Sequence, residues 1–423
     1  MTLSRRDFLA TTAALSAPLV LPAALRGQRT SANDRIGLGF IGVGTMGRGH
    51  LGAFLGMDDV QVVAVCDVVA ERRENALKMV RDRYAERKKG EPTGCKEYSD
   101  FRKLLEQKDV DAVVIATPDH WHAIPCVRAA EAGKDIYCEK PLTHHIDEGK
   151  KIVEAVRRHK VVFQTGSQQR SEFGGRFRYA AELIRAGRIG KVKTVRIGVG
   201  GPAVPCDLPE QPVPEGTDWD LWLGPAPERG YNEVLCPKGV HRHFPAWRNY
   251  REYAGGGLAD MGAHHFDIAQ WALGMDGSGP VKVEPPEGKE TRGLKFTYAG
   301  GVEMIHNVFE GERADCLFEG TDGTIAVSRG SFKITPEERI KEKDEIQMVN
   351  GNHRRNWVEC VRTRQDPVCP AEVGHRSATI CHLGNIGYWL RRPLQWDPQR
   401  QQYVGDDEAN ALLYREGRGE WKL

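Results

Sequence analysis

The stretch that decides the fold is residues 36–47, IGLGFIGVGTMG. Its first six residues are an apolar run of strand character, and Gly42, Gly44 and Gly47 follow with dinucleotide-binding spacing. In such a turn the first glycine permits a tight bend. The second lets the backbone approach a pyrophosphate, and the third lets a helix pack closely on the strand. With 47 glycines in the chain the spacing alone is weak evidence, so its setting has to support it.

The residues around this turn favour NAD as the cofactor. Thr45 and Met46 begin the expected helix, where free N–H groups and the helix dipole favour phosphate. Asp67 ends the next expected strand about 20 residues further on, the position from which a carboxylate binds the adenosine ribose. Its charge would repel a 2′-phosphate, which favours NAD over NADP. Arg72 and Arg73 keep NADP open, because either guanidinium could hold that phosphate.

Alternating segments in the first half of the chain predict an α/β domain. Apolar runs at 60–67, 110–117 and 135–140 have the pattern of buried strands, and residues 70–88 have that of a charged helix. Near-continuous apolar strands joined by helical crossovers indicate a parallel sheet with helices on both faces. We therefore expect a Rossmann dinucleotide-binding domain.

The second half of the chain predicts an α+β domain with a large, mostly antiparallel sheet. Residues 192–199 and 302–309 resemble half-exposed strands, and a long Pro- and Trp-rich segment, 202–247, lies between them. Irregular segments of this length are more often functional or at an interface than idle. Helical periodicity returns at 352–389. The expected units are the Rossmann domain at 33–158, a substrate and oligomerisation domain at 159–351, and C-terminal helices and a tail that pack back on both at 352–423.

The N-terminus has the features of a twin-arginine export signal over residues 1–31. Arg5 and Arg6 precede an Ala- and Leu-rich apolar stretch that runs to about residue 25. An N-terminal helix or membrane anchor is the alternative, although paired arginines before such a run serve no core-packing purpose. We therefore expect a periplasmic or otherwise exported protein. Nicotinamide cofactors are not freely supplied outside the cytoplasm, so an exported redox enzyme should carry its cofactor tightly bound.

Composition excludes several classes of partner. The chain has 60 basic and 58 acidic residues, a balance without the charge surplus of a nucleic-acid-binding or acidic-membrane-binding protein. Beyond the leader, no apolar run is long enough to span a bilayer. The ten cysteines form no Cys-x-x-Cys motif. Cys66 and Cys138 should be core residues, while Cys360, Cys369 and Cys381 could include a disulfide.

Histidines occur repeatedly in close pairs, which raises the question of a metal site. Imidazole is a common zinc and transition-metal ligand. No pair has a familiar spacing with a matching third ligand nearby, so no metal is expected. The pairs are His120 with His122, His144 with His145, His241 with His243, and His264 with His265.

Two further motifs complete a resemblance to a known family. ATPDHWH at 116–122, with EKPL at 139–142, precedes GGGLADMGAHHFD at 255–267. In this order, after the glycine-rich turn, they resemble the glucose–fructose oxidoreductase/inositol dehydrogenase (Gfo/Idh/MocA) family over essentially the whole mature chain. Residues 219–225 and 353–389 resemble an exported twin-arginine subgroup whose substrates are mostly unassigned.

The resemblance implies the catalytic residues Lys140, His264 and Asp260. Lys140 ends a parallel strand, where α/β sheets bind ligands, and its ammonium can stabilise alkoxide character on a substrate oxygen. Asp260 and His264, four residues apart, would share one face of a helix. His264 would be the general base, and Asp260 would bind substrate or orient the imidazole. His265 points about 100° away and is the competing assignment. Pro141 would follow a cis peptide.

The remaining site residues belong to loops. Trp121 could stack on a sugar or wedge the loop, and Arg170 could reach substrate or form a structural ion pair. His122 could contact the nicotinamide half or the substrate, and the glycines at 255–257 would let backbone approach a ligand. The expected cofactor-binding residues are Gly42, Gly44, Thr45, Met46, Gly47, Asp67, Thr117, Pro118, His122, Glu139 and Lys140. The expected substrate-binding residues are Trp121, Lys140, Arg170, Asp260 and His264.

Three functions compete. The first is an exported NAD(P)-dependent oxidoreductase acting on a secondary hydroxyl of a sugar, glycoside or cyclitol. The second is an NAD-dependent glycoside hydrolase or lyase, as in some relatives, which works through transient C3 oxidation and needs no paired glycosidase carboxylates. The third is a non-catalytic sugar-binding protein. The resemblance also implies a homodimer or homotetramer, assembled through the open face of the second sheet.

Overall fold

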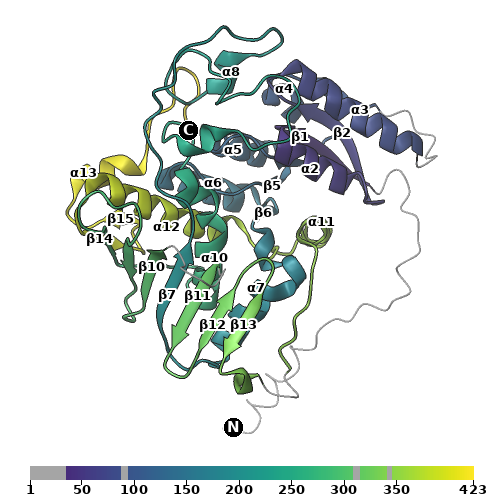
Figure 1. Ribbon diagram of the computed structural model, residues 1–423. Helices are drawn as coiled ribbons and strands as arrows, with labels where there is room; N and C mark the ends of the chain where they lie inside the picture. Colours follow the sequence, from purple (N-terminus) through teal and green to yellow (C-terminus); the bar gives the residue numbers. More distant parts are fainter. Residues whose placement is uncertain (1–34, 87–93, 308–314, 341–344) are drawn as a thin grey trace, which may run out of the picture. The chain divides into compact units, whose positions relative to one another are not determined.

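The computed structural model describes residues 35–86, 94–307, 315–340 and 345–423. The strand before the glycine-rich turn belongs to a six-stranded parallel sheet (Figure 1). The strand order is β3-β2-β1-β4-β5-β6, and every pair is parallel. The chain order reverses between β1 and β4, which places a ligand crevice at their carboxyl ends. The strands are β1 Ile36–Ile41, β2 Val60–Cys66, β3 Lys96–Tyr98, β4 Ala112–Ile115, β5 Asp135–Cys138 and β6 Phe163–Thr165.

Helices cover both faces of this sheet, as its apolar strands predict. On one face α2, α3 and α11 contribute Phe54, Val80 and Trp357 to a core with Phe40. On the other face α4, α5 and α6 pack against residues such as Val113. The C-terminal helix α11 therefore packs on the first domain. The bounds are α2 Thr45–Phe54, α3 Ala70–Glu86, α4 Phe101–Leu105, α5 Ala123–Glu131, α6 Ile146–His159 and α11 His353–Thr363.

A second sheet has the order β13-β12-β11-β7-β10-β9-β8-β14-β15. Its pairs are antiparallel apart from β7 and β10, which confirms the predicted α/β chain with a mostly antiparallel second sheet. Val195 and Ile197 of β7 are buried while their neighbours are not, because α7, α10 and α12 cover one face only. The strands are β7 Val192–Gly198, β8 Lys282–Glu284, β9 Lys295–Thr297, β10 Glu303–Asn307, β11 Cys316–Gly320, β12 Thr324–Val327, β13 Phe332–Thr335, β14 Leu394–Asp397 and β15 Gln402–Tyr403.

The predicted domain limits can be compared with these elements. β6 lies beyond residue 158, so the parallel sheet continues past the limit drawn from the sequence. The export signal expected at 1–31 lies outside the described residues. The remaining helices are α7 Arg176–Arg185, α8 Trp219–Leu223, α9 Gly256–Asp260, α10 Gly262–Ala272, α12 Ala371–Leu390 and α13 Asp407–Asn410.

The Pro- and Trp-rich segment has a core of its own beside the nucleotide-binding domain. Trp222, Tyr231 and Trp247 pack together with Val69, which follows β2. Backbone hydrogen bonds join the two regions, from Ala70 N–H to Gly216 O at 2.8 Å and from Asp218 N–H to Val68 O at 3.0 Å. The segment therefore closes the adenosine end of the first domain.

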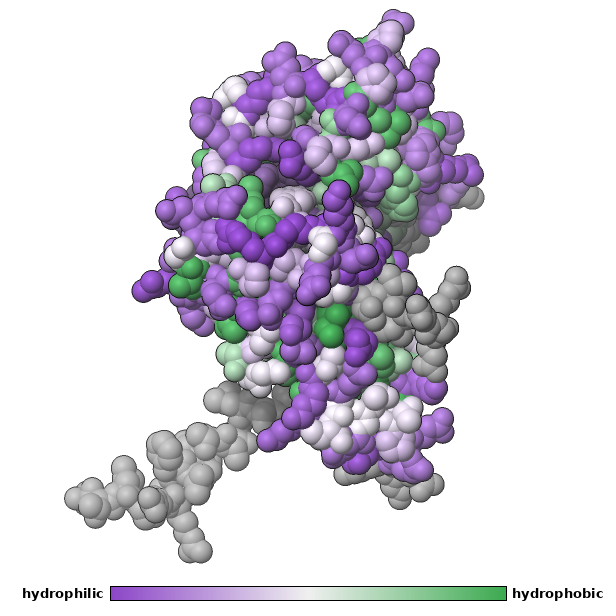
Figure 2. All heavy atoms as spheres, turned by 60° about the vertical axis from the view of Figure 1, so that its left-hand side comes forward, coloured by the Kyte–Doolittle hydropathy of each residue, from purple (hydrophilic) through white to green (hydrophobic). Residues whose placement is uncertain are grey.

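One face of the protein is mainly hydrophilic (Figure 2), and most of the cysteines are buried. On the face drawn in Figure 2, hydrophilic residues predominate and hydrophobic ones are scattered among them. Cys66 and Cys138 are buried, as predicted, and all ten cysteines are free, so Cys360, Cys369 and Cys381 form no disulfide. Over the described ranges, no helix has both the length and the apolar character to cross a membrane.

Candidate active site

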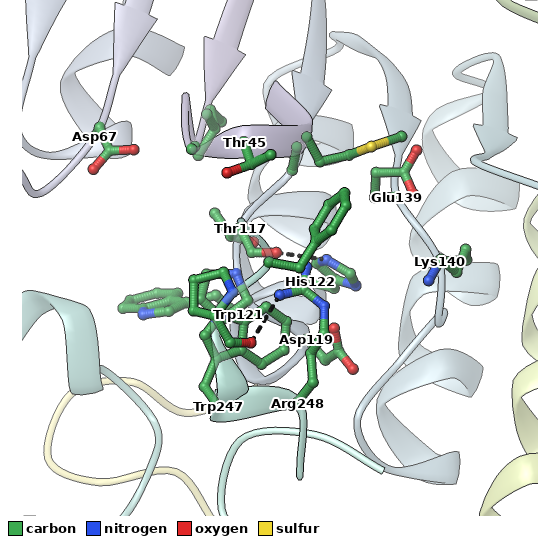
Figure 3. A pocket seen from close by; sticks show the side chains of 18 of the residues that line it. Thr45, Asp67, Thr117, Asp119, Trp121, His122, Glu139, Lys140, Trp247 and Arg248 are labelled. Carbon is green, nitrogen blue, oxygen red and sulfur yellow. Dashed lines mark hydrogen bonds between the residues drawn. The ribbon is translucent and has the colours of Figure 1, made fainter. Parts of the chain in front are cut away.

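A cavity of about 400 Å³ lies at the carboxyl ends of the parallel strands, between the first sheet and the second domain (Figure 3). In the close view Asp67 lies at one end and Lys140 at the other, with Thr45, Thr117 and His122 between them. The predicted residues that line it are Gly42, Gly44, Thr45, Met46, Asp67, Thr117, Pro118, Trp121, His122, Glu139, Lys140, Asp260 and His264. The cavity therefore gathers residues that the sequence places more than 200 positions apart.

The glycine-rich turn forms a cradle at the start of α2. Gly42 has φ of +85°, and a Cβ there would lie 2.8 Å from the backbone of Ala116. A Cβ on Gly47 would lie 2.0 Å from the carbonyl oxygen of Gly42, which explains why the helix can approach the strand. A Cβ on Gly44 meets nothing within 4 Å, because this position faces the cavity. These three positions fit the close approach of a pyrophosphate.

Asp67 faces the cavity at the adenosine end. Its carboxylate accepts hydrogen bonds from the N–H groups of Val43 at 2.9 Å and Val69 at 3.0 Å. These bonds orient a carboxylate that has further acceptor sites for a ribose. The Arg73 guanidinium donates to the carbonyl oxygen of Asp67 at 2.7 Å and does not line the cavity. Of the two arginines considered for a 2′-phosphate, only Arg72 lines it.

Residues 236–245, which we call the strap, cross over the glycine-rich turn. Arg72 donates to the carbonyl oxygens of Pro237 at 2.6 Å and Gly239 at 3.1 Å. Thr45 Oγ1 donates to the carbonyl oxygen of His243 at 2.9 Å, and Arg48 donates to that of His241. Strap residues also line the cavity opposite the turn. The strap is therefore hydrogen-bonded to the helix that begins at the phosphate cradle.

Lys140 and Asp260 meet at the other end of the cavity. Lys140 Nζ donates to Asp260 Oδ1 and to the Asp260 carbonyl oxygen, both at 2.7 Å. Arg248 Nε lies 3.6 Å from the same Oδ1. Burial raises the pKa of Asp260, but the charges of Lys140 and Arg248 outweigh it and leave that pKa below its usual value. Asp260 thus positions the lysine. The Lys140–Pro141 peptide is cis, as the resemblance implied.

His264 is the cavity-facing member of its histidine pair. It is 4% exposed, and its Nδ1 has no hydrogen-bond partner among the described residues. Burial, followed by the charges of Lys140 and Arg329, lowers its pKa well below the usual value, so the imidazole is neutral. His265 instead places Nδ1 3.2 Å from the carbonyl oxygen of Gly198 and does not line the cavity. An imidazole that lines the cavity and forms no described side-chain hydrogen bond suits a base that accepts a proton from a substrate hydroxyl.

The expected single helix through Asp260 and His264 is wrong. α9 ends at Asp260 and α10 begins at Gly262, with Met261 between them. The backbone remains near helical values at Met261, so both side chains still reach the cavity. Asp260 binds Lys140 and forms no described hydrogen bond with the imidazole, so the expectation that it orients His264 is not supported.

The loop after β4 is held by contacts within the protein. His122 places Nδ1 2.8 Å from the carbonyl oxygen of Pro141 and Nε2 3.1 Å from that of Thr117, joining the ends of β4 and β5. Trp121 Nε1 donates to the carbonyl oxygen of Trp222 at 2.9 Å. Its ring packs edge-on against Trp421, with centroids 4.9 Å apart. These contacts favour the wedge role for Trp121, although it also borders the cavity.

Glu139 belongs to a buried hydrogen-bonded chain. Its Oε1 lies 2.8 Å from His50 Nε2 and accepts from Gln168 at 2.7 Å, while Arg354 donates to His50 Nδ1 at 2.8 Å. Because Arg354 donates to Nδ1, His50 carries its proton on Nε2 and donates to Glu139. Burial opposes ionisation of Glu139, yet these hydrogen bonds and the charge of Lys140 lower its pKa. The sequence offered no motif for His50 or Arg354.

Two expectations about the second domain are corrected. Arg170 does not line the cavity; it is 2% exposed and donates to Asp267 at 2.8 Å and to Asp276 at 2.7 Å. It is the structural ion pair, not a substrate ligand. The glycines at 255–257 also avoid the cavity: a Cβ on Gly256 would lie 2.5 Å from the backbone of residue 203. Their role is backbone packing within the second domain.

The sequence analysis missed five ionisable residues of the cavity, Asp119, Glu172, Arg248, Arg329 and Arg354. Arg248 and Arg329 line the cavity from the second domain, and Asp119 lines it from the loop after β4. Burial raises the pKa of Asp119 to about 8, so its carboxyl is largely protonated at neutral pH. Neither Arg248 nor Arg329 stands in a recognisable motif, because they are brought to the site by tertiary structure alone. Within the described ranges, no group of three or more His, Cys, Asp or Glu side chains is arranged to hold a metal.

Comparison with known proteins identifies both halves of the chain. Residues 36–167 match the family described as oxidoreductase family, NAD-binding Rossmann fold (GFO_IDH_MocA), and residues 204–423 match its C-terminal alpha/beta domain. The uncharacterized oxidoreductase YrbE of Bacillus subtilis is 26% identical over 81% of this chain and 91% of its own. Inositol 2-dehydrogenase of Salmonella typhimurium is 34% identical over 36% of this chain and 42% of its own.

Other similarities are more limited. A glycosyl hydrolase family 109 protein of Shewanella pealeana is 33% identical over 37% of this chain and 38% of its own. Among solved structures, the WlbA dehydrogenase of Bordetella pertussis, in complex with NADH and UDP-GlcNAcA, has a TM-score of 0.60. It is 19% identical and covers 86% of this chain and 99% of its own. This structural likeness confirms the fold.

Proposed function

The chain belongs to the Gfo/Idh/MocA oxidoreductase family, and we propose that it oxidises or reduces a secondary hydroxyl of a sugar, glycoside or cyclitol. The observation that carries the proposal is the pairing of Lys140 with an unpartnered His264 in one cavity, opposite the glycine-rich turn. The Salmonella relative, an inositol 2-dehydrogenase, supports a polyhydroxylated substrate.

The chain's residues divide the chemistry at the substrate hydroxyl. NAD, when bound, supplies the hydride acceptor. His264, neutral and without a protein partner, accepts the hydroxyl proton. The Lys140 ammonium donates a hydrogen bond to the same oxygen and stabilises its developing negative charge. Asp260 keeps the ammonium in place through a 2.7 Å contact. In the reverse direction the imidazolium returns the proton.

We propose NAD, tightly held, as the cofactor. Asp67 supports NAD because its carboxylate faces the cavity and would repel a 2′-phosphate. The strap supports retention, since it lines the cavity opposite the glycine-rich turn and is hydrogen-bonded to Arg72, Arg48 and Thr45. These hydrogen bonds should slow any movement of the strap that releases the cofactor. Retention also fits the proposal that the protein is exported.

A redox-assisted glycoside hydrolase or lyase is the second candidate. Asp119 favours it, because a carboxyl that is largely protonated at neutral pH and lines the cavity could give its proton to a departing aglycone. The Shewanella relative, a glycosyl hydrolase family 109 protein, is in keeping with this chemistry. A non-catalytic sugar-binding protein is the third candidate, and the intact Lys140–Asp260 pair beside His264 weighs against it.

One experiment separates the candidates. The purified protein, with no added cofactor, is incubated with nitrophenyl and methyl glycosides while NADH absorbance and free aglycone are measured. The oxidoreductase predicts NADH without cleavage, and the glycosidase predicts cleavage without net NADH. If neither NADH nor free aglycone is detected and no nucleotide is released on denaturation, the result favours a non-catalytic sugar-binding protein. Full activation by added NAD of a cofactor-free preparation would contradict retention.

We also propose a homodimer or homotetramer. Helices α7, α10 and α12 cover one face of the second sheet, which leaves the other face for a partner. That face carries cross-strand ion pairs, including Arg196 with Glu319 and Lys295 with Glu303, both at 3.0 Å. Light scattering during gel filtration that returns the mass of one chain would contradict this proposal.

A further inference from the structure

Positive charge gathers around one carboxylate at the catalytic end of the cavity. Asp260 interacts with Lys140 at 2.7 Å and with Arg248 at 3.6 Å, and the charge of Arg329 also acts on it. One carboxylate therefore faces three cations. Arg329 forms no ion pair within 4 Å with a carboxylate of the described residues, and the charges of Asp315 and Asp260 act on it from farther away.

The other acids of the cavity do not cancel this excess. Asp119 is largely protonated at neutral pH because burial raises its pKa to about 8. Glu172 is paired with Arg354 at 3.6 Å. Glu139 is ionised and accepts hydrogen bonds from His50 and Gln168. Among the residues that line this end of the cavity, the cations Lys140, Arg248, Arg329 and Arg354 outnumber the ionised acids Asp260, Glu139 and Glu172. The charge of Asp315, which does not line the cavity, acts on Arg329 from outside it.

Aromatic rings hold both arginines in place. The Arg248 guanidinium lies 4.2 Å from the ring centroid of Trp247 and 5.0 Å from that of Phe244. The Arg329 guanidinium lies 4.7 Å from the ring centroid of Phe173. Stacking uses the flat face of a guanidinium and leaves its N–H donors at the edge free to bind an anion. Only Pro245 O and Gln169 Oε1 accept from these guanidinium groups among the described residues.

We propose that the substrate carries an anionic group, a carboxylate or a phosphate, which binds to Arg248 and Arg329 beside the hydroxyl that Lys140 and His264 handle. Planar guanidinium groups bind both kinds of anion through paired hydrogen bonds. The inference rests on the proposed function and narrows its substrate to an acidic sugar, such as a uronate or a sugar phosphate. A neutral hexoside would leave the N–H donors of both guanidinium groups without an anionic acceptor in the cavity.

Matched sugars test this inference. Methyl glucoside, galactoside and mannoside are compared with the corresponding methyl uronides and 6-phosphates, using calorimetric binding to the protein as purified with its cofactor. We expect at least one acidic member to bind about tenfold or more tightly than its neutral partner. The uronides and phosphates, measured separately, identify which anion is preferred. If no acidic sugar binds more tightly than its neutral partner, the inference is wrong.

Variants assign the preference to the two arginines. Arg329→Gln and Arg248→Gln should each bring the ratio of the affinities for the acidic and the neutral sugar close to one, whatever either change does to the affinity for the neutral sugar. Arg329→Lys should restore part of the preference, because charge returns without the paired hydrogen bonds. Arg128→Gln, on the exposed side of α5 and paired with Glu131, is the matched control and should retain the preference. Preference retained in both Gln variants would overturn the assignment.

The two proposals can fail separately. Tight anion binding without any change in NADH absorbance would leave this inference standing and count against the oxidoreductase. Turnover of neutral sugars with no preference for acidic ones would support the oxidoreductase and contradict the inference of an anionic substrate group.

Discussion

Lys140 and His264 come from different domains and meet in one cavity, so their individual substitutions test the proposed chemistry. His264→Ala should lower kcat/KM by about 10²–10⁴-fold because the hydroxyl loses its base. Lys140→Ala should lower it by about 10²–10³-fold because charge on the substrate oxygen is no longer stabilised. Steady-state NADH formation measures both effects, with bound nucleotide quantified to show that the cofactor remains. Activity near that of the parent protein in either variant would contradict the assignment.

The pKa of His264 leads to a distinct pH profile. Burial and the charges of Lys140 and Arg329 hold this pKa well below 6.5, so the imidazole stays neutral as the pH falls. We therefore expect kcat/KM to show no inflection near pH 6.5 on the acid side. The profile is measured from pH 7.5 to 5.5 at constant ionic strength, with activity after return to pH 7.5 as the control for unfolding. An acid limb with an apparent pKa of about 6.5 would contradict this expectation.

At the scale of elements, the strap should govern cofactor exchange. Arg48→Gln removes the bond from α2 to the carbonyl oxygen of His241, and we expect bound nucleotide to dissociate at least about tenfold faster. Lys78→Gln, on the exposed side of α3, is the matched control. The rate is followed by gel filtration and by loss of NADH fluorescence during competition. Equal dissociation rates in Arg48→Gln and the parent protein would exclude the strap as the barrier.

The observed helices and strands show which parts of the fold and of the site could be predicted from the sequence. Apolar runs predicted the strands of the first sheet, because β4 and β5 are buried on both faces and carry no alternation. The break at Met261 was missed, since helical spacing on both sides of it is continuous in sequence. Arg248 and Arg329 were missed because a cavity wall built from distant turns leaves no local pattern. Motifs identified the residues near the cofactor and also Lys140, Asp260 and His264, whereas only the tertiary structure shows that Arg248 and Arg329 line the same cavity.

At the scale of the whole molecule, buried histidines should make stability depend on pH. Burial lowers the pKa of each below the unfolded value of about 6.5, so the unfolded chain binds more protons as the pH falls. Each of these buried, neutral histidines makes its full contribution to the free energy of unfolding above pH 6.5, and this contribution is lost progressively toward pH 4. At pH 5 the loss is up to about 2 kcal/mol per histidine. Asp119, with its raised pKa, acts in the opposite direction as a single group. The histidines are His120, with a pKa of about 3, and His265, His306, His353, His375 and His382, with pKa values of about 4.

Scanning calorimetry at pH 7.5, 6.0 and 5.0, at fixed ionic strength, checks this dependence. The Tm should fall at each step because the unfolded state gains protons that the folded state cannot accept. A Tm that stays constant or rises toward pH 5 would show that these histidines are accessible to protons in the folded protein.

The most direct test of the account is a single turnover by the protein as purified. The protein is mixed with each matched sugar without added NAD, and absorbance at 340 nm is followed by stopped flow. We predict that NADH appears up to one equivalent per chain with the accepted sugar, and that His264→Ala, which retains its nucleotide, gives none. An absence of bound nucleotide after denaturation, or the same absorbance change in His264→Ala, would contradict a retained cofactor reduced through this site.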